Sequence, residues 1–181
     1  MSLFTNAVGA APDERRAYVS SVLALVGDED PIDVLSRLTE RIDELIGGLS
    51  DEALRRPESP GKWSIVHVIR HLADAELVWA FRLRMVLAHD EPELAGFDQD
   101  LWASRLGYDT TDLPDVIEQL TVLRKANLRL LRDLPASALQ RTAVHRERGR
   151  ETLAQMLRLY AGHDLVHVRQ LDRLVGRWAK S

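Results

Sequence analysis

The chain has 181 residues and a mass of 20.5 kDa, which is enough for one domain with a sizeable hydrophobic core. A formal net charge of −4 argues against nucleic-acid binding, and no run of residues is long and apolar enough for a membrane span. The absence of cysteine excludes disulfides, thiolate metal sites and a protein-borne thiol nucleophile.

Helical periodicity runs through nearly the whole chain, and no segment shows the alternation that predicts a β-strand. The expected helices, in chain order, are 13–26, 31–46, 64–88, 112–134 and 151–178, with a short one near 100–105. Four long helices predict an all-α four-helix bundle with one or two additional short helices. We expect one domain over 1–181, with a core at about 32–178 and an N-terminal helical extension over 1–28.

The first twelve residues have neither the basic region nor the apolar region of a signal peptide. Together with the absence of cysteine, this predicts a cytoplasmic protein.

Four of the six histidines form two pairs at the i, i+4 spacing inside predicted helices. His67 and His71 lie in the helix that begins near Ser64, and His163 and His167 lie in the last helix. A four-residue step places two side chains about 40° apart on one helix face. That spacing allows two imidazoles to reach one metal ion, as in other helical zinc sites.

The helix faces select three of these histidines as candidate metal ligands. In the last helix, His163 and His167 lie on or beside the apolar face that points into the bundle. His71 borders the apolar stripe of its helix, whereas His67 lies a further 40° or so toward the polar side. The sequence therefore predicts a site formed by His71, His163 and His167.

A three-histidine site leaves a coordination position open, which is typical of catalytic rather than structural metal sites. A metal ion there can lower the pKa of a bound water or thiol and present the anion as a nucleophile. Because imidazole binds metal only when neutral, occupancy is expected to fall below a pH of about 6. The alternative is a set of structural histidines with satisfied hydrogen bonds and no metal.

Five further residues are candidates for the pocket or for support of the ligands. Asp74 and Asp164 could accept an imidazole N–H, with a solvated or ion-paired role as the alternative. Glu76 falls on the apolar side of its helix, where a buried carboxylate must be paired or protonated. We expect a salt bridge from Glu76 to an arginine, with a general-base role as the alternative. Tyr160 and His145 complete the set.

Two loops are expected near the mouth of the site. The polar loop over 136–150 carries arginines that could hold carboxylates or remain solvated: Arg141, Arg146, Arg148 and Arg150. In the other long loop, Phe97 and Trp102 either cover the pocket or anchor the loop.

Three motifs in order resemble the DinB-like (YfiT-like) metalloprotein superfamily of bacteria. They are W-S-x6-H-L-x-D at Trp63–Asp74, H-x3-G-x2-T at His145–Thr152 and H-D-x2-H-x2-Q-L at His163–Leu171. The resemblance covers about residues 32–175.

The resemblance implies a four-helix bundle with a three-histidine metal site, commonly as a homodimer, and kinship with bacillithiol transferases and mycothiol-dependent isomerases. Carried over by position, the ligands are His71, His163 and His167. Zinc or nickel is the implied ion, and imidazole ligands alone do not distinguish them. The implied reaction is S-transfer, in which the metal stabilises a small-molecule thiolate and directs it at an electrophile.

Four hypotheses about function stay open at this point. The first is a metal-dependent S-transferase that uses a low-molecular-weight thiol on a small-molecule substrate. The second is a metal-dependent hydrolase that uses water at the same position, and it differs from the first in needing no added thiol. The third is a non-catalytic, stress-related helical binding module. The fourth, an HD-type phosphohydrolase, needs a further aspartate ligand for which Asp172 has no supporting motif.

Overall fold

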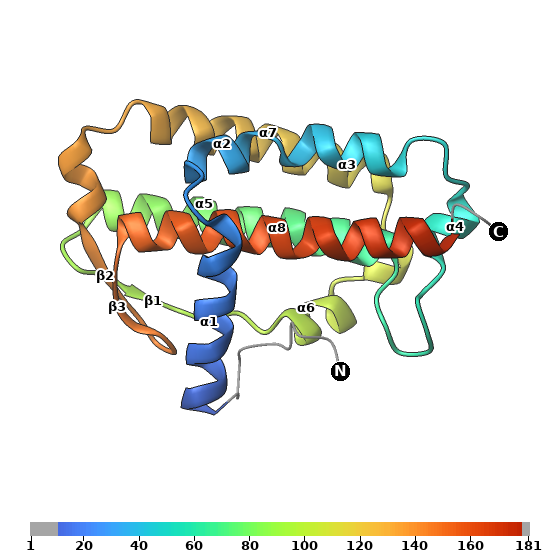
Figure 1. The fold of residues 1–181 in the computed structure, drawn as a ribbon, viewed down its shortest axis with the longest axis horizontal. Coiled ribbons are helices and arrows are strands. Elements are labelled where there is room, and N and C mark those ends of the chain that lie inside the picture. Colours follow the sequence, from blue (N-terminus) through green and yellow to red (C-terminus); the bar gives the residue numbers. More distant parts are fainter. Residues whose placement is uncertain (1–10, 179–181) are drawn as a thin grey trace.

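Helices dominate the computed structural model, which describes residues 11–178 (Figure 1). Predictions for residues 1–10 and 179–181 lie outside this range. The α-helices are α1 (Pro12–Val26), α2 (Pro31–Ser36), α3 (Leu38–Ile46), α4 (Asp51–Arg55), α5 (Ile65–Ala88), α6 (Gln99–Arg105), α7 (Leu113–Arg132) and α8 (Leu153–Trp178). Two 3₁₀ turns, η1 (Tyr108–Thr110) and η2 (Ala136–Gln140), complete the helical elements in this part of the chain.

The long helices form the expected four-helix bundle. Helices α2 and α3 follow one another along one corner and pack on α7 and α8, while α5 packs on α7 and α8 from the other side. Each corner of the bundle therefore has two neighbours, and the apolar stripes of the helices meet inside it. Among residues 11–178, no helix combines the length and the apolar composition that crossing a membrane requires.

Side-chain caps start the helices where the sequence predicted them. The carboxylate of Asp30 accepts a hydrogen bond from the backbone N–H of Ile32 at 2.7 Å, and α2 follows. The hydroxyl of Ser64 accepts from the backbone N–H of His67 at 3.4 Å at the start of α5. These bonds satisfy backbone donors that lack a partner in the first helical turn.

The helix expected over 31–46 is divided into α2 and α3, so that prediction was wrong in one respect. The interruption falls at Arg37, with φ −91° and ψ −11°. Two carbonyls just before it accept side-chain donors: that of Leu35 from the buried Arg124 at 2.8 Å, and that of Asp33 from the hydroxyl of Ser36 at 2.8 Å. Such side-chain bonds compete with regular helical hydrogen bonding.

A small sheet at one end of the bundle was not predicted. It contains β1 (Glu93–Leu94), β2 (Thr142–His145) and β3 (Gly149–Thr152). Strand β2 is central, parallel to β1 and antiparallel to β3. Strands of two to four residues are too short for alternation to be recognised. The sheet also moves the start of the last helix from the expected residue 151 to Leu153.

Helix α1 crosses α8 outside the bundle (Figure 1). The crossing point is Gly162, where an added Cβ would lie 2.4 Å from the backbone oxygen of Val22. Val22 and Val26 are buried there. The N-terminal helix thus contributes to the core, and glycine is required at 162 because the two backbones approach so closely.

We predict that Gly162→Ala destabilises the fold by about 1–3 kcal/mol in urea unfolding, because the new methyl group collides with backbone rather than with a flexible side chain. The matched control is Gly176→Ala on the same helix, where nothing lies within 4 Å of an added Cβ. That change should stabilise by about 0.5–1 kcal/mol through helix propensity. Equal effects of the two substitutions would contradict the close approach at Gly162.

Candidate metal centre

Three histidines from two helices converge inside the bundle. His71 comes from α5, and His163 and His167 come from successive turns of α8. One ring nitrogen of each lies within 4.8 Å of the others, and the Nε2 atoms of His71 and His163 are 3.1 Å apart. The structure therefore brings together the three histidines that the sequence analysis selected.

The spacing of these nitrogens suits a single small cation. Two ligands of a tetrahedral zinc site, each about 2.0–2.1 Å from the ion, lie about 3.3 Å apart. The 3.1 Å separation of His71 and His163 is close to that value. His167 pairs its Nδ1 with the Oε1 of Gln170 at 2.9 Å, an arrangement that fixes the ring and leaves Nε2 as the donor to a metal.

Burial keeps the three rings neutral. It lowers the pKa of His71 and His163 well below the ordinary value, and neighbouring histidines add to the shift. Burial also lowers the pKa of His167 to about 4, against a small opposing effect of Gln170. Neutral imidazole is the form that binds metal. Lowered pKa values reduce the competition of protons with a metal ion at pH values below the ordinary imidazole range.

Aromatic rings enclose the histidines. The ring centroid of Trp63 lies 5.0 Å from that of His71, and Phe97 stacks on His71 at 6.1 Å. Trp102 packs against Phe97 at 4.9 Å. The loop aromatics were expected either to cover the pocket or to anchor the loop. Phe97 covers the histidines, and Trp102 packs against Phe97.

His67 lies away from the cluster, as its helix face indicated. Its Nδ1 is 2.8 Å from the hydroxyl of Ser64, and its Nε2 is 3.1 Å from the carboxylate of Asp109. Ser64 is the buried N-cap of α5, and Asp109 belongs to η1. His67 therefore serves to fasten that region.

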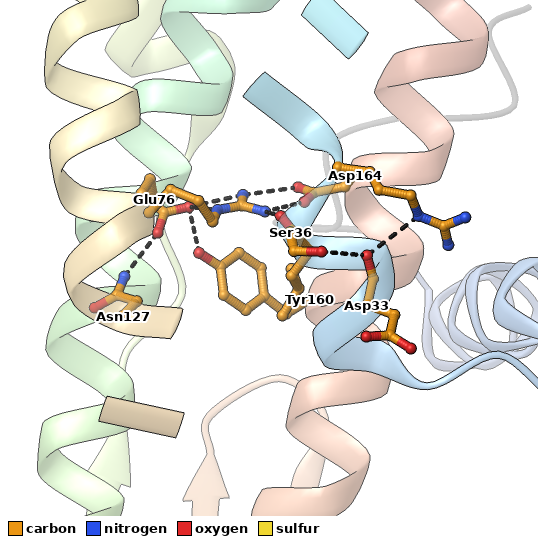
Figure 2. Close-up of polar contacts among 9 residues, drawn as sticks. Asp33, Ser36, Glu76, Asn127, Tyr160 and Asp164 are labelled. Atoms are coloured by element: carbon orange, nitrogen blue, oxygen red, sulfur yellow. Dashed lines mark hydrogen bonds and ion pairs between the residues drawn. The ribbon is translucent and has the colours of Figure 1, made fainter. Parts of the chain in front are cut away.

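A buried ionic network connects the helices of the bundle (Figure 2), and one of its members, Asp164, directly follows His163 in the sequence. The guanidinium of Arg124 on α7 donates to Glu76 on α5 at 2.8 Å and to Asp164 on α8. Glu76 also accepts from the amide of Asn127 at 2.7 Å and from the hydroxyl of Tyr160. All the hydrogen bonds of Glu76 are thus made to groups that hold the helices together.

These contacts decide among the supporting roles considered for Glu76, Asp164 and Tyr160. Glu76 forms the expected salt bridge with an arginine, so it has no free oxygen for general-base catalysis. Asp164 is ion-paired to another helix rather than bonded to an imidazole. Burial raises the pKa of Asp164 to about 6 against the opposing effect of Arg124, because one guanidinium faces two carboxylates.

Asp74 differs from its expected position on the polar side of α5. It is buried, accepts a hydrogen bond from the hydroxyl of Tyr108 at 2.8 Å and lies 3.3 Å from Arg70. Of the solvated and ion-paired roles expected for Asp74, the structure shows the ion-paired one, and the carboxylate is buried because η1 folds over this face and covers it with Tyr108. Asp74 holds the loop after α6 rather than a histidine ring.

A cavity of about 120 Å³ adjoins the histidines. His71 and His163 form part of its wall, with Phe97 beside them. The rest of the polar wall consists of Arg82, Gln99, His145, Glu147 and Arg148, with Tyr18 of α1 at the edge. Of the loop arginines considered, Arg148 reaches this cavity. Arg141 instead caps the end of α5 by donating to the carbonyl of Val86 at 2.7 Å.

Sequence reasoning missed Arg82. It lies three residues after Trp79 and four before Val86, so it falls on the apolar stripe of α5. An arginine on such a stripe is a signal, since an isolated charge is rarely buried without a purpose. The segment after α5 covers Arg82 and supplies the carbonyl of Ala95 to which it donates a hydrogen bond, and the sequence pattern does not predict the path of that segment.

A sequence model of the DinB superfamily matches residues 35–171, and the chain belongs to this family. A relative from Oceanobacillus iheyensis is 28% identical over 148 residues, covering 81% of this chain and 84% of the relative. YfiT from Bacillus subtilis is 26% identical over 149 residues, covering 80% and 84%. Both carry provisional names as metal-dependent hydrolases.

The solved structure of Bacillus subtilis YfiT superposes with a TM-score of 0.76 at 25% identity, over 82% of this chain and 86% of that one. It is described as having an unusual four-helix bundle topology. The order of helices found here therefore matches a fold already seen in a relative.

We predict that the metal-free protein loses stability as the pH falls. The pKa of His167 is lower in the folded state than its ordinary value of 6.5, so below that pH the unfolded chain binds more protons. Unfolding free energy should drop between a pH of about 6.5 and about 4, by about 3 kcal/mol from His167 alone. The raised pKa of Asp164 acts in the opposite direction and offsets part of this.

Urea unfolding in the presence of a chelator, repeated across this pH range, measures the effect. His89→Gln is the control because His89 is exposed, and it should leave the slope unchanged. A free energy of unfolding that stays constant over the range would contradict the burial of neutral imidazoles.

Replacement of the network cation gives a second prediction. Arg124→Met leaves Glu76 and Asp164 buried without a counterion, and it should cost about 3–5 kcal/mol in urea unfolding. Arg129→Met, an exposed change on the same helix, should alter stability by less than about 0.5 kcal/mol. Similar effects of the two substitutions would show that the network does not stabilise the bundle.

Proposed function

We propose that this protein is a metal-dependent hydrolase whose zinc or nickel ion is held by His71, His163 and His167. The convergence of three neutral imidazoles beside a small cavity is the observation that supports it. The provisional names of the relatives agree with this class of reaction. We further propose a small-molecule substrate, a homodimer and a cytoplasmic location, as expected from the sequence.

A divalent ion bound by imidazoles acts as a Lewis acid and makes a coordinated water or thiol more acidic. The chain contributes the geometry and the surroundings. Gln170 holds the ring of His167 in one orientation, and the rings of Trp63 and Phe97 restrict the access of bulk water. A dry, fixed site strengthens electrostatic interactions with the reacting groups.

Hydrolysis also needs a group that accepts a proton from water. Glu147 is the one carboxylate among the described residues that line the cavity. Glu76 is unavailable because its oxygens are bonded to Arg124, Asn127 and Tyr160. We therefore assign the role of general base to Glu147.

Thiol-dependent S-transfer is the second proposal. It is favoured because, among the described residues, Glu147 is the one carboxylate of the cavity wall, so that hydrolysis depends on this side chain alone. A thiol ionises near a pKa of about 8.5 and needs less help from a base than water does. Because the chain has no cysteine, the thiol would have to be a small molecule.

Metal content tests the site itself. We expect about one ion per chain in protein purified without chelator, and loss of most of it in His71→Ala, His163→Ala and His167→Ala. His67→Ala, four residues from His71, is the matched control and should keep the metal. Elemental analysis of the folded variants measures this. Wild-type protein without stoichiometric metal would contradict the proposal.

The two reactions are separated by a base substitution and a thiol requirement. Hydrolysis of small esters and amides by the metal-loaded protein should proceed without thiol, and Glu147→Gln should lower kcat by about 100-fold with unchanged metal content. Activity that requires an added low-molecular-weight thiol and is insensitive to Glu147→Gln would replace hydrolysis by S-transfer.

A further inference from the structure

Two buried polar side chains meet in the cavity beside the three histidines. Arg82 comes from α5, and His145 comes from the central strand β2 of the small sheet. Arg82 is 6% exposed and His145 is 1% exposed, and both line the same 120 Å³ cavity as His71 and His163. Neither belongs to the ionic network around Arg124.

Arg82 has no direct ion-pair partner among the described residues, although Glu147 and Glu151 act electrostatically on its charge from farther away. Its Nη2 donates to the backbone carbonyl of Ala95, but its buried Nε has no hydrogen-bond partner within residues 11–178. No carboxylate of that part of the chain lies within 4.0 Å of its guanidinium nitrogens. A buried cation without a counterion is costly, so its retention points to an anionic ligand.

His145 adds a neutral donor. Its Nδ1 accepts a hydrogen bond from the backbone N–H of Glu147 at 3.2 Å, so the ring proton resides on Nε2. That Nε2 atom is buried and has no partner among the described residues. Burial and the nearby Arg148 and Arg82 lower the pKa of His145 to about 3, which keeps the ring uncharged.

The other charged side chains of the cavity wall are Glu147 and Arg148, and both act electrostatically on Arg82 without forming an ion pair with it. Arg148 is engaged by Glu151 through two hydrogen bonds of 2.9 and 2.6 Å. The carboxylate of Glu147 packs against Gly96, where an added Cβ would meet its Oε1. Among the described residues, Arg82 is therefore the cationic side chain of the cavity wall that lacks a direct ion pair, and the donor of His145 lines the same cavity.

We propose that Arg82 and His145 form an oxyanion subsite that binds a carboxylate of the substrate next to the three-histidine centre. The cavity of about 120 Å³ is small, so acetate, a minimal carboxylate, is the probe that fits its size class. The substrate class is thus a small carboxylate-bearing molecule. That the bound anion is part of a substrate rests on the proposed function. The binding of an anion by Arg82 and His145 does not require a metal ion.

Acetate and its neutral isostere acetamide are the probes. Titration of the full chain, followed by ligand NMR, should show acetate binding in both metal-loaded and chelator-treated protein. Acetamide should bind at least about tenfold more weakly, because it lacks the charge that pairs with Arg82. Equal binding of the two probes would overturn the subsite.

Variants assign the binding to the two side chains. Arg82→Met and His145→Phe should each weaken acetate binding by about tenfold or more, and Arg82→Lys by less, because the charge is kept and the planar fork is lost. Arg146→Met is the matched control, an exposed arginine of the same hairpin outside the cavity. Circular dichroism checks that each variant folds. If Arg82→Met does not fold, the acetate affinities of the two single variants Arg82→Lys and His145→Phe show whether these side chains bind the anion.

The outcomes separate this assignment from the proposed function. Acetate binding that depends on Arg82 in protein that takes up no metal would keep the subsite and contradict the metal centre. Acetate binding that requires the metal and ignores Arg82 and His145 would overturn the subsite and leave the metal centre intact.

Discussion

The buried guanidinium of Arg124 is the interaction on which the arrangement of the bundle depends. It contacts the backbone of α2 at Leu35, Glu76 on α5 and Asp164 on α8, while belonging itself to α7. One cation thus joins all four corners of the bundle at one level. Glu76 lies five residues from His71, and Asp164 is adjacent to His163. The network therefore fixes the helices at the level where the imidazoles must meet.

Helix propensity and helix faces predicted most of the fold and the convergence of His71, His163 and His167. Periodicity identifies which side of a helix is inward, and a four-residue spacing puts two rings on that side. The same reasoning failed where tertiary contacts overrode local pattern. Asp74 was expected on the polar side of its helix, but η1 buries it. The helix break at Arg37 occurs where the carbonyl of Leu35 accepts a hydrogen bond from Arg124, a distant residue that the local sequence does not reveal.

The cavity escaped prediction for a related reason. His145 was noticed through a motif, but its neighbour Arg82 is sixty-three positions earlier and meets it only because β2 pairs with the segment after α5. Non-local pairing of strands this short leaves no periodic trace in the sequence. The bundle thus supplies the three clustered histidines, and the small sheet brings His145 to the cavity beside them.

Helix α1 lies before the segment that the DinB family model matches, which begins at residue 35. Yet Tyr18, Val19 and Val22 of this helix form one side of the cavity, and Val22 rests on α8 beside His163. The cavity wall is therefore made partly by a helix that precedes the segment matched by the family model, whereas the three histidines lie within that segment. Substitutions on the cavity side of α1 can change the shape of the cavity while leaving the histidine-bearing helices unchanged.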